Sequence, residues 1–319
     1  SPESPILLLK KNIKNDLPEE IAPLQDCIGF MLPYTPLHCL LFKNLKKPLI
    51  MTSGNLSDEP QCTSIEEVRK YLKDIANLAV WYDRDIVNRL DDSVVSITSA
   101  GFQIIRRARG FSPSPLKLPD GFTKKRTILA LGADLKNTFC LIKNGQAIIS
   151  QHIGDLKDLR AEEEYENQIE KYLLFYDADP DLLVCDLHPD YSSSRYGEVM
   201  KKSLKISLLT VQHHHAHIAS CMGENMLPLN HEPILGIALD GMGLGKDDTI
   251  WGGEFLLSDY RSCERIACFN PIPLLGGNKA MKEPWRNIAA HIITHFGWDH
   301  FFEKYGKLEL ASFLKEKPL

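Results

Sequence analysis

The sequence predicts a mixed α/β protein with two domains. The chain has 319 residues, of which 44% are apolar or aromatic, and at roughly 150 residues per domain this is enough for about two hydrophobic cores. Short apolar runs alternate with amphipathic helical patterns along the chain. A proline-rich segment at 113–126 separates two such regions and has the composition of a linker. We therefore expect one domain over residues 1–112 and a second over residues 127–319.

The first region has the pattern of an α+β or α/β domain. Apolar runs typical of strands alternate in it with helical patterns. The best-defined helix is predicted over Ser64–Asn77, where Ser64 and Glu67 form a capping box. Its apolar stripe is formed by Ile65, Val68, Leu72 and Ile75.

The second region begins with three predicted strands over residues 127–151. The last two of these strands are joined at Asn144-Gly145, a pair that favours a two-residue hairpin turn. A helix over Ala161–Tyr176, a strand over Leu182–Asp186 and a histidine-rich helix follow. The apolar run Pro233–Asp240 then leads into a glycine-rich loop, and a further strand starts at Glu254. This order of elements is expected of a half-domain of the actin/sugar-kinase type of ATPase.

The composition excludes several classes of protein. The net charge is 37 − 42 = −5 without long blocks of one sign, which disfavours binding to duplex nucleic acid or to an anionic membrane. The longest apolar runs are far shorter than the ~20 residues that a bilayer span needs, and no signal peptide is visible. The eight cysteines include no C-x-x-C pair, so we expect reduced thiols and a cytoplasmic location.

The most specific chemical pattern is the segment VQHHHAHIASCMGEN at residues 211–225. On a helix, His213 and His217 project from one face about one turn apart, as two ligands of a single metal ion require. Asp240 ends the apolar run that precedes a glycine-rich segment, at the kind of strand end where ligand groups gather. Two imidazoles and one carboxylate suit a zinc or ferrous ion. Alternatively, the histidines cap a helix or contact a neighbouring domain, and Asp240 forms a turn.

Three further groups are candidates for binding a nucleotide or a carbamoyl-like substrate. Glycines after Asp240 and in the next strand let backbone N–H groups approach a phosphate. Small polar residues follow an apolar strand at MTSGNLSDEP. Arginines near residue 107 can form guanidinium forks with phosphates. Ordinary turns and a solvated strand end are the alternatives for these groups. The candidate residues are Gly241, Gly243, Gly253, Thr52, Ser53, Asn55, Arg106 and Arg109.

Taken together, several long motifs of the chain match one known family. They include MTSGNLSDEP, NRLDDSVV, IRRARGFSPSPL, LALGADLKNTFCLIKNGQAIISQHIGDL, CDLHPDYSSSRY, VQHHHAHIASCMGEN, ALDGMGLGKDDTIWGGEFL and GGNKAMKEPWR. The ensemble resembles the HypF family of carbamoyltransferases, which mature nickel–iron hydrogenases. The resemblance covers nearly the whole chain and implies the later part of a YrdC-like domain followed by the earlier part of a TsaD-like domain.

The resemblance also implies a reaction and its site. HypF proteins use carbamoyl phosphate and ATP, through carbamate and a carbamoyl-adenylate, to carbamoylate the C-terminal cysteine of the partner HypE for cyanide ligand synthesis. By this resemblance Ser53 and Asn55 match the S-x-N signature of YrdC domains, while His213, His217 and Asp240 match the metal ligands of the transfer domain. We also assign Glu283, in GGNKAMKEPWR, to nucleotide or substrate binding. No residue is assigned as a catalytic acid, base or nucleophile.

Alternatives remain open from the sequence. A small-molecule O-carbamoyltransferase would share this two-domain plan, and an actin-like nucleotide-binding module would share the second domain without transferase chemistry. The tRNA threonylcarbamoyl machinery is disfavoured by the acidic composition. Because both domains look incomplete beside complete HypF proteins, we expect this chain alone to lack full turnover and to retain at most loose metal binding.

Overall fold

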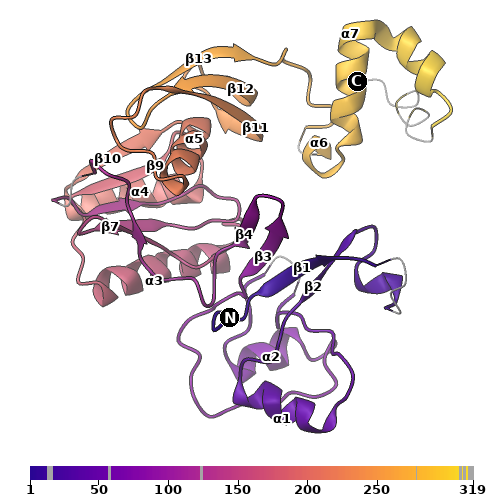
Figure 1. Cartoon of the computed structure of the whole chain (residues 1–319), viewed down its shortest axis with the longest axis vertical. Helices are drawn as coiled ribbons and strands as arrows, with labels where there is room; N and C mark the ends of the chain where they lie inside the picture. The colour runs from indigo at the N-terminus through magenta and orange to yellow at the C-terminus, as the bar shows by residue number, and fades with distance from the viewer. Residues whose placement is uncertain are drawn as a thin grey trace. The chain divides into compact units, whose positions relative to one another are not determined.

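Strands and helices alternate along the chain, which confirms the mixed α/β class. The computed structural model describes residues 1–12, 17–56, 59–122, 125–277, 279–308, 311 and 314. They form two compact units, one of residues 1–213 and 222–231 and the other of residues 214–221 and 232–319. Figure 1 labels the helices and strands along the chain. The proline-rich segment at 113–126 lies inside the first unit, with residues 123 and 124 outside the described ones. The domain boundary expected there stays a prediction.

The first sheet of the first unit has four strands in the order β2-β1-β3-β4. Strands β1 and β3 are parallel, and the other pairs are antiparallel. Two helices and a short 3₁₀ helix lie between these strands in sequence. The bounds are β1 Ile6–Lys10, the 3₁₀ helix Glu19–Ile21, β2 Cys27–Phe30, α1 Pro36–Asn44, α2 Ile65–Tyr71, β3 Val94–Thr98 and β4 Gly101–Arg106.

Helix α2 begins at the capping residue that the sequence predicts. The hydroxyl of Ser64 accepts a hydrogen bond from the Glu67 backbone N–H at 3.1 Å. The Glu67 carboxylate reaches back one residue further than in a standard capping box and accepts from the backbone N–H of Thr63 at 2.6 Å. The helix ends at Tyr71, earlier than the predicted Asn77.

The second sheet of the first unit has six strands in the order β10-β9-β6-β7-β8-β5. Strands β6, β9 and β10 are parallel, whereas β6, β7 and β8 form an antiparallel meander. The bounds are β5 Leu116–Lys117, β6 Ile128–Ala130, β7 Cys140–Lys143, β8 Gln146–Ile149, α3 Leu159–Phe175, β9 Leu182–Asp186, α4 Ser192–Leu204 and β10 Ser207–Val211.

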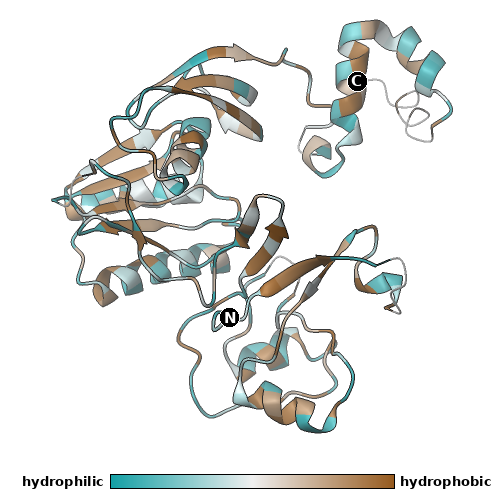
Figure 2. Cartoon of the chain, in the orientation of Figure 1, coloured by the Kyte–Doolittle hydropathy of each residue, from teal (hydrophilic) through white to brown (hydrophobic). Residues whose placement is uncertain are grey.

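The elements of this second sheet follow from local sequence. Asn144 and Gly145 both adopt positive φ, at 54° and 76°, as the predicted hairpin turn between β7 and β8 requires. Helix α3 is capped by Asp158, whose side chain accepts a hydrogen bond from the Ala161 backbone N–H at 3.0 Å. Figure 2 shows mostly apolar colouring along the strands of the two larger sheets and mixed colouring on the helices. Helix α3 buries Ala161, Tyr165, Gln168 and Ile169, which lie along one of its faces.

The largest hydrophobic core of the first unit lies where α3 and α4 cover the parallel strands. Its fully buried side chains come from β6, β9 and α3 and from the loop before β7. Helix α3 contributes Tyr165, whose hydroxyl donates to the Leu131 carbonyl at 2.9 Å and so satisfies its only polar group in the core. The core residues are Leu129, Leu131, Phe139, Leu156, Tyr165, Ile169, Leu183, Cys185 and Met200.

The second unit contains an antiparallel sheet in the order β11-β12-β13. Residues 214–221 of helix α5 pack on it, and Ile218 contacts the sheet at Gly236. A separate helical core surrounds Leu275, Ala290 and Phe301. The bounds are α5 His213–Glu224, β11 Ile234–Leu244, β12 Ile250–Ser258, β13 Cys263–Cys268, α6 Lys279–Lys282 and α7 Trp285–Tyr305, with a break of helical geometry at Gly297.

Strand β11 differs from its prediction. The sequence indicates that Asp240 ends the strand and that a glycine-rich loop follows, but β11 continues to Leu244. The register jumps from Leu239 opposite Gly253 to Gly243 opposite Trp251, so residues 240–242 form a bulge. Gly241 and Gly243, which predicted a loop, therefore lie in and next to this bulge within the sheet. Among the described residues, no helix is both long and apolar enough to cross a bilayer.

Candidate metal centre

The two candidate histidine ligands lie in the first turns of helix α5. Strand β10 ends at Val211, and the helix begins at His213, so a single residue separates the sheet from the first imidazole. His217 follows one turn later, on the same side of the helix. The side chain of His213 is 17% exposed and that of His217 is 58% exposed. One imidazole is thus enclosed by protein while the other faces open space.

The third candidate ligand comes from the bulge of strand β11. Asp240 places its Oδ2 3.4 Å from Nε2 of His217, and its Oδ1 accepts a hydrogen bond from the Gly241 backbone N–H at 2.6 Å. Regular pairing would hold residue 240 opposite the next strand, whereas the bulge changes the direction of its side chain. The bulge is therefore the local feature that aims the carboxylate at helix α5.

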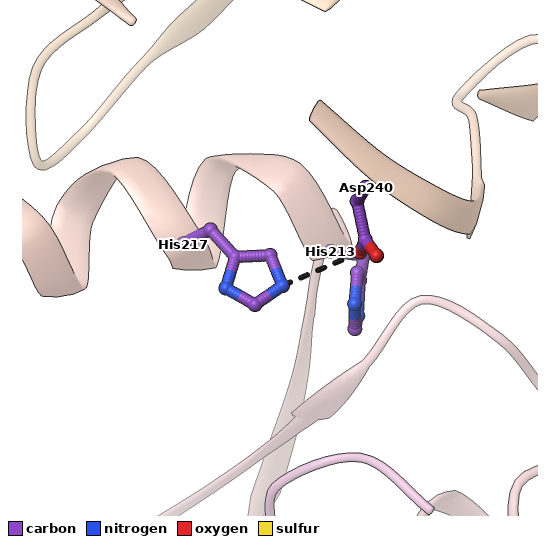
Figure 3. Close-up of side chains that lie close together, drawn as sticks. All are labelled: His213, His217 and Asp240. Atoms are coloured by element: carbon purple, nitrogen blue, oxygen red, sulfur yellow. Dashed lines mark ion pairs between the residues drawn. The ribbon is translucent and has the colours of Figure 1, made fainter. Parts of the chain in front are cut away.

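His213, His217 and Asp240 form one cluster (Figure 3). One donor atom of each lies within 4.8 Å of the others. Two donors bound to one zinc ion at about 2.1 Å lie about 3.4 Å apart in tetrahedral geometry, which matches the His217–Asp240 separation. The donor chemistry of two imidazoles and a carboxylate also fits a zinc or ferrous ion. These residues therefore fit the expected cation with small side-chain movements.

The other two histidines of the segment have different surroundings. His214 is fully buried and stacks on Trp251 with ring centroids 6.3 Å apart, and its Nε2 lies 4.0 Å from Asp240 Oδ2. His215 directs its Nε2 to the carbonyl of Asp259 at 2.7 Å, and a carbonyl can only accept, so that nitrogen carries a proton. His215 is thus tied to the end of strand β12. His215 lies outside the cluster of three converging side chains.

One functional candidate was missed by sequence reasoning. The carboxylate of Asp186, the last residue of strand β9, lies 2.6 Å from Nδ1 of His213. The only signal was the position of this aspartate at the end of an apolar strand in the motif CDLHPD. This signal does not identify His213 as the partner of Asp186, because 26 residues lie between them in sequence.

The described polar residues of MTSGNLSDEP lie in a bent loop. Thr52 and Ser53 are exposed, and Ser53 accepts the backbone N–H of Asn55 at 3.1 Å. The Asn55 amide donates to the carbonyls of Leu56 at 2.8 Å and Glu59 at 2.9 Å, which organises the loop. Residues 57 and 58 of the motif lie outside the described residues. Nothing in this geometry tests substrate binding, so the assignment of these residues stays a prediction.

The two candidate arginines differ in their engagement. Arg106 is 41% exposed and lies 3.7 Å from Asp91. Arg109 donates to Asp92 at 2.7 Å and to the carbonyls of Glu3 and Ser4, and its guanidinium stacks on Tyr34 at 3.5 Å. Arg109 therefore joins the start of the chain to the end of the first sheet. Of the two, Arg106 has the side chain that is more accessible to a phosphate.

The remaining candidates lie in the second unit. Gly241 stands in the bulge with open space beside it, whereas Gly243 is buried in strand β11. A Cβ on Gly253 would lie 2.3 Å from the ring of Phe269, so this glycine makes room for an aromatic side chain. Glu283 accepts from Arg286 at 2.8 Å and remains 41% exposed. Their proposed contacts with a nucleotide stay predictions.

Comparison with known sequences gives three family matches that follow one another along the chain. Residues 1–108 match the family described as Telomere recombination, the Sua5/YciO/YrdC family. Residues 123–224 match the HypF Kae1-like domain, and residues 236–316 match the second subdomain of the carbamoyltransferase Kae1-like domain. Carbamoyltransferase HypF of Rhodobacter capsulatus is 44% identical over 291 residues, 91% of this chain. The chain belongs to the HypF family.

Other relatives agree with this membership. Carbamoyltransferase HypF of Synechocystis sp. is 43% identical over 96% of this chain. A crystal structure of full-length HypF in the phosphate- and nucleotide-bound form is 43% identical and superposes with a TM-score of 0.85 over 98% of this chain. The crystal structure of T. kodakarensis HypF has the same TM-score at 36% identity.

These HypF relatives are longer than the chain. It spans 39% of the R. capsulatus and Synechocystis proteins, and 48% and 42% of the two crystallised chains. The structural matches confirm YrdC-like and Kae1-like folds in one polypeptide.

Proposed function

We propose that this chain is the part of a carbamoyltransferase that binds a carbamoyl-adenylate and presents its carbamoyl group to a thiol. The proposal depends chiefly on the convergence of His213, His217 and Asp240 in a chain of the HypF family. Relatives named carbamoyltransferase and a neighbour crystallised with nucleotide and phosphate support it. The proposed substrates are carbamoyl phosphate and ATP, and the proposed acceptor is the C-terminal cysteine of HypE.

The chemistry balances in three steps. Water first hydrolyses carbamoyl phosphate to carbamate and inorganic phosphate. A carbamate oxygen attacks the α-phosphorus of ATP and pyrophosphate leaves, giving the carbamoyl-adenylate. The acceptor thiolate then attacks the carbonyl carbon, the C–O bond to phosphate breaks, and AMP leaves with the electron pair. A zinc or ferrous ion, when bound, supplies Lewis acidity toward an oxygen of the carbamoyl-adenylate.

The residues of this chain have separate parts in that scheme. The cation is held by His213, His217 and Asp240. Because the side chain of His217 is exposed, a substrate can reach the cation from that side. We assign Thr52, Ser53, Asn55 and Arg106 to the adenylate-forming site. Arg109, Gly241, Gly243, Gly253 and Glu283 remain candidate nucleotide contacts.

Two of the chain's eight thiols are poorly suited to act as the nucleophile. Burial raises the pKa of Cys140 to about 12, and burial also raises the pKa of Cys185, the cysteine next to Asp186 in sequence. A thiol with a raised pKa is a poor nucleophile near neutral pH. No disulfide joins any of the eight cysteines, all of which the structure describes, and this is consistent with the reducing cytoplasm that we propose as the compartment.

The cation site is tested by elemental analysis of the chain and of single variants. After loading with excess zinc or iron salt, we expect the unaltered chain to bind the metal loosely, and we expect at least a tenfold loss of affinity in His217→Ala and in Asp240→Asn. His215→Gln is the matched control, because it lies on the same helix, retains a donor for the Asp259 carbonyl and should keep the metal. Equal metal content in all four proteins would contradict the site.

Transfer is tested with the full-length protein that contains this chain. Carbamoyl phosphate, ATP and a peptide ending in the HypE cysteine should give a carbamoylated peptide and AMP, both detected by mass spectrometry. The His217→Ala variant should lose this product, while His215→Gln should not. Product only with a sugar hydroxyl would indicate a small-molecule O-carbamoyltransferase, and nucleotide binding without any product would indicate a binding module.

A further inference from the structure

Two parallel strands bring an acidic side chain beside the start of helix α5. In the register of β9 and β10, Asp186 pairs with Val211, and the backbone N–H of Leu187 donates to the Val211 carbonyl at 2.9 Å. Both strands therefore end at the same level, and β10 continues after one residue into His213. This topology places the carboxylate of Asp186 next to the first imidazole of the candidate metal centre.

The contact has the geometry of a fixed, charge-assisted hydrogen bond. Oδ2 of Asp186 lies 2.6 Å from Nδ1 of His213, and Oδ1 accepts the backbone N–H of His188 at 2.9 Å. The side chain of Asp186 is 7% exposed, so water competes little for its oxygens. Both oxygens are engaged, and the carboxylate cannot rotate without losing one of these bonds.

The contact also decides the chemical form of His213. A carboxylate only accepts hydrogen bonds, so Nδ1 of His213 carries the proton and the lone pair of the neutral ring lies on Nε2. A metal ion binds a histidine nitrogen through such a lone pair. A carboxylate that accepts a hydrogen bond from the second ring nitrogen of a metal-binding histidine fixes the tautomer and the orientation of the ring. Removing such a carboxylate weakens metal affinity about 10- to 100-fold.

We propose that Asp186 is a positioning residue of the cation site, which holds His213 as its Nδ1–H tautomer with Nε2 as the metal-binding atom. This inference deepens the proposed function and depends on it for the identity of the cation. Asp186 itself lies outside the cluster of three converging ligands. Its effect on the metal therefore passes through His213.

The tautomer is measured first, in the metal-free chain. Long-range ¹H–¹⁵N correlation spectra of ¹⁵N-histidine protein report which nitrogen of His213 is protonated. We expect Nδ1–H in the unaltered chain and a shift toward Nε2–H in Asp186→Asn, because the introduced amide can donate to Nδ1. An unchanged His213 tautomer in Asp186→Asn would overturn the proposal, whether or not a cation binds.

Metal affinity is measured second, by competition of Zn²⁺ with a chromophoric chelator. Asp186→Asn should weaken binding about 10- to 100-fold. The exposed Asp190, four residues further along, gives the matched control Asp190→Asn, which should bind as the unaltered chain does. Circular dichroism identifies any variant that fails to fold, and Asp186→Glu then serves as a second variant that retains the charge.

A double-mutant cycle separates positioning from a direct role. In the background of His213→Ala, the additional change Asp186→Asn should cause no further loss of affinity. A full additional loss there would overturn the proposal and indicate that Asp186 acts on the cation directly. Failure of the unaltered chain to bind Zn²⁺ or Fe²⁺ would contradict the cation site of the proposed function, and the tautomer measurement would then decide the part of Asp186 independently.

Discussion

Arg160, in the first turn of helix α3, lies 2.8 Å from the carboxylate of Glu59, a residue 101 positions earlier in the chain. The same guanidinium lies 3.2 Å from Glu67 and stacks over the ring of Tyr71 at 4.7 Å. Arg89 joins this group by pairing with both Glu67 and Glu164. Two arginines thus hold the segment around helix α2 against helix α3.

Replacing Arg160 should loosen this junction. Arg160→Ala removes two ion pairs and one ring contact, but Glu59 is 36% exposed, so we expect a loss of only about 1 kcal/mol in the free energy of unfolding. Arg160→Lys should cause a smaller loss in the free energy of unfolding than Arg160→Ala, because lysine keeps the positive charge but lacks the planar guanidinium. Urea unfolding at low and high salt measures both. A loss that does not change with salt would contradict an electrostatic origin.

The same junction should weaken in acid. Burial favours a higher pKa for the Glu67 carboxyl, but the Thr63 backbone N–H and the guanidinium groups of Arg89 and Arg160 outweigh burial and hold that pKa below its ordinary value. When the pKa of a carboxyl is lower in the folded chain than in the unfolded chain, its ionised form stabilises the fold at pH values above the unfolded-state pKa. This stabilisation is lost as the pH falls through the folded-state pKa. The stability difference between the unaltered chain and Glu67→Gln should therefore shrink below about pH 4. A difference that is constant between about pH 7 and pH 3 would exclude this linkage.

Gly132 should not tolerate a side chain. It has φ of +74°, and a Cβ built on it would lie 2.3 Å from the backbone carbonyl oxygen of Thr138. Gly132→Ala should cost at least about 2 kcal/mol, from the left-handed backbone and the clash together. Gly101→Ala is the control, since that residue also has positive φ but no atom within 4 Å of the added Cβ. Thermal unfolding should show the smaller loss for Gly101→Ala, and equal losses would indicate that the clash is relieved.

Cys140 should resist alkylation. Because burial raises the pKa of its thiol to about 12, only about one molecule in 10⁴ carries the thiolate at pH 8. Iodoacetamide followed by peptide mapping should therefore label the exposed Cys39 long before Cys140. Comparable labelling of the two in the folded chain would show that Cys140 is accessible and ionised. Labelling in urea controls for the recovery of both peptides.

Local sequence predicted those elements whose signals lie within a few residues. Ser64 caps helix α2, Asn144 and Gly145 form the hairpin turn, and strand β9 covers the predicted residues 182–186. The spacing of His213 and His217 also placed both on one side of helix α5. Each of these features depends on backbone geometry over four or five residues, which the order of residues specifies directly.

Features that depend on distant pairing were not predicted. The sequence put Asp240 at a strand end, but the register of β11 against β12 makes a bulge there and continues the strand to Leu244. The contacts of Arg109 with Asp92 and with carbonyls near the start of the chain were likewise not predicted, and its assignment to phosphate binding stays a prediction. Nothing near these residues in sequence specifies the segment that packs against them.

The sequence by itself determined the mixed α/β class, the family and the three candidate ligands, because periodicity and motifs are local or shared with relatives. Only the tertiary structure joined Asp186 to His213 and Arg160 to Glu59. Those contacts depend on the register of parallel strands and on helix packing, which bring together residues 27 and 101 positions apart. Such proximity results from burial of the whole core, and no short segment contains the information that specifies it.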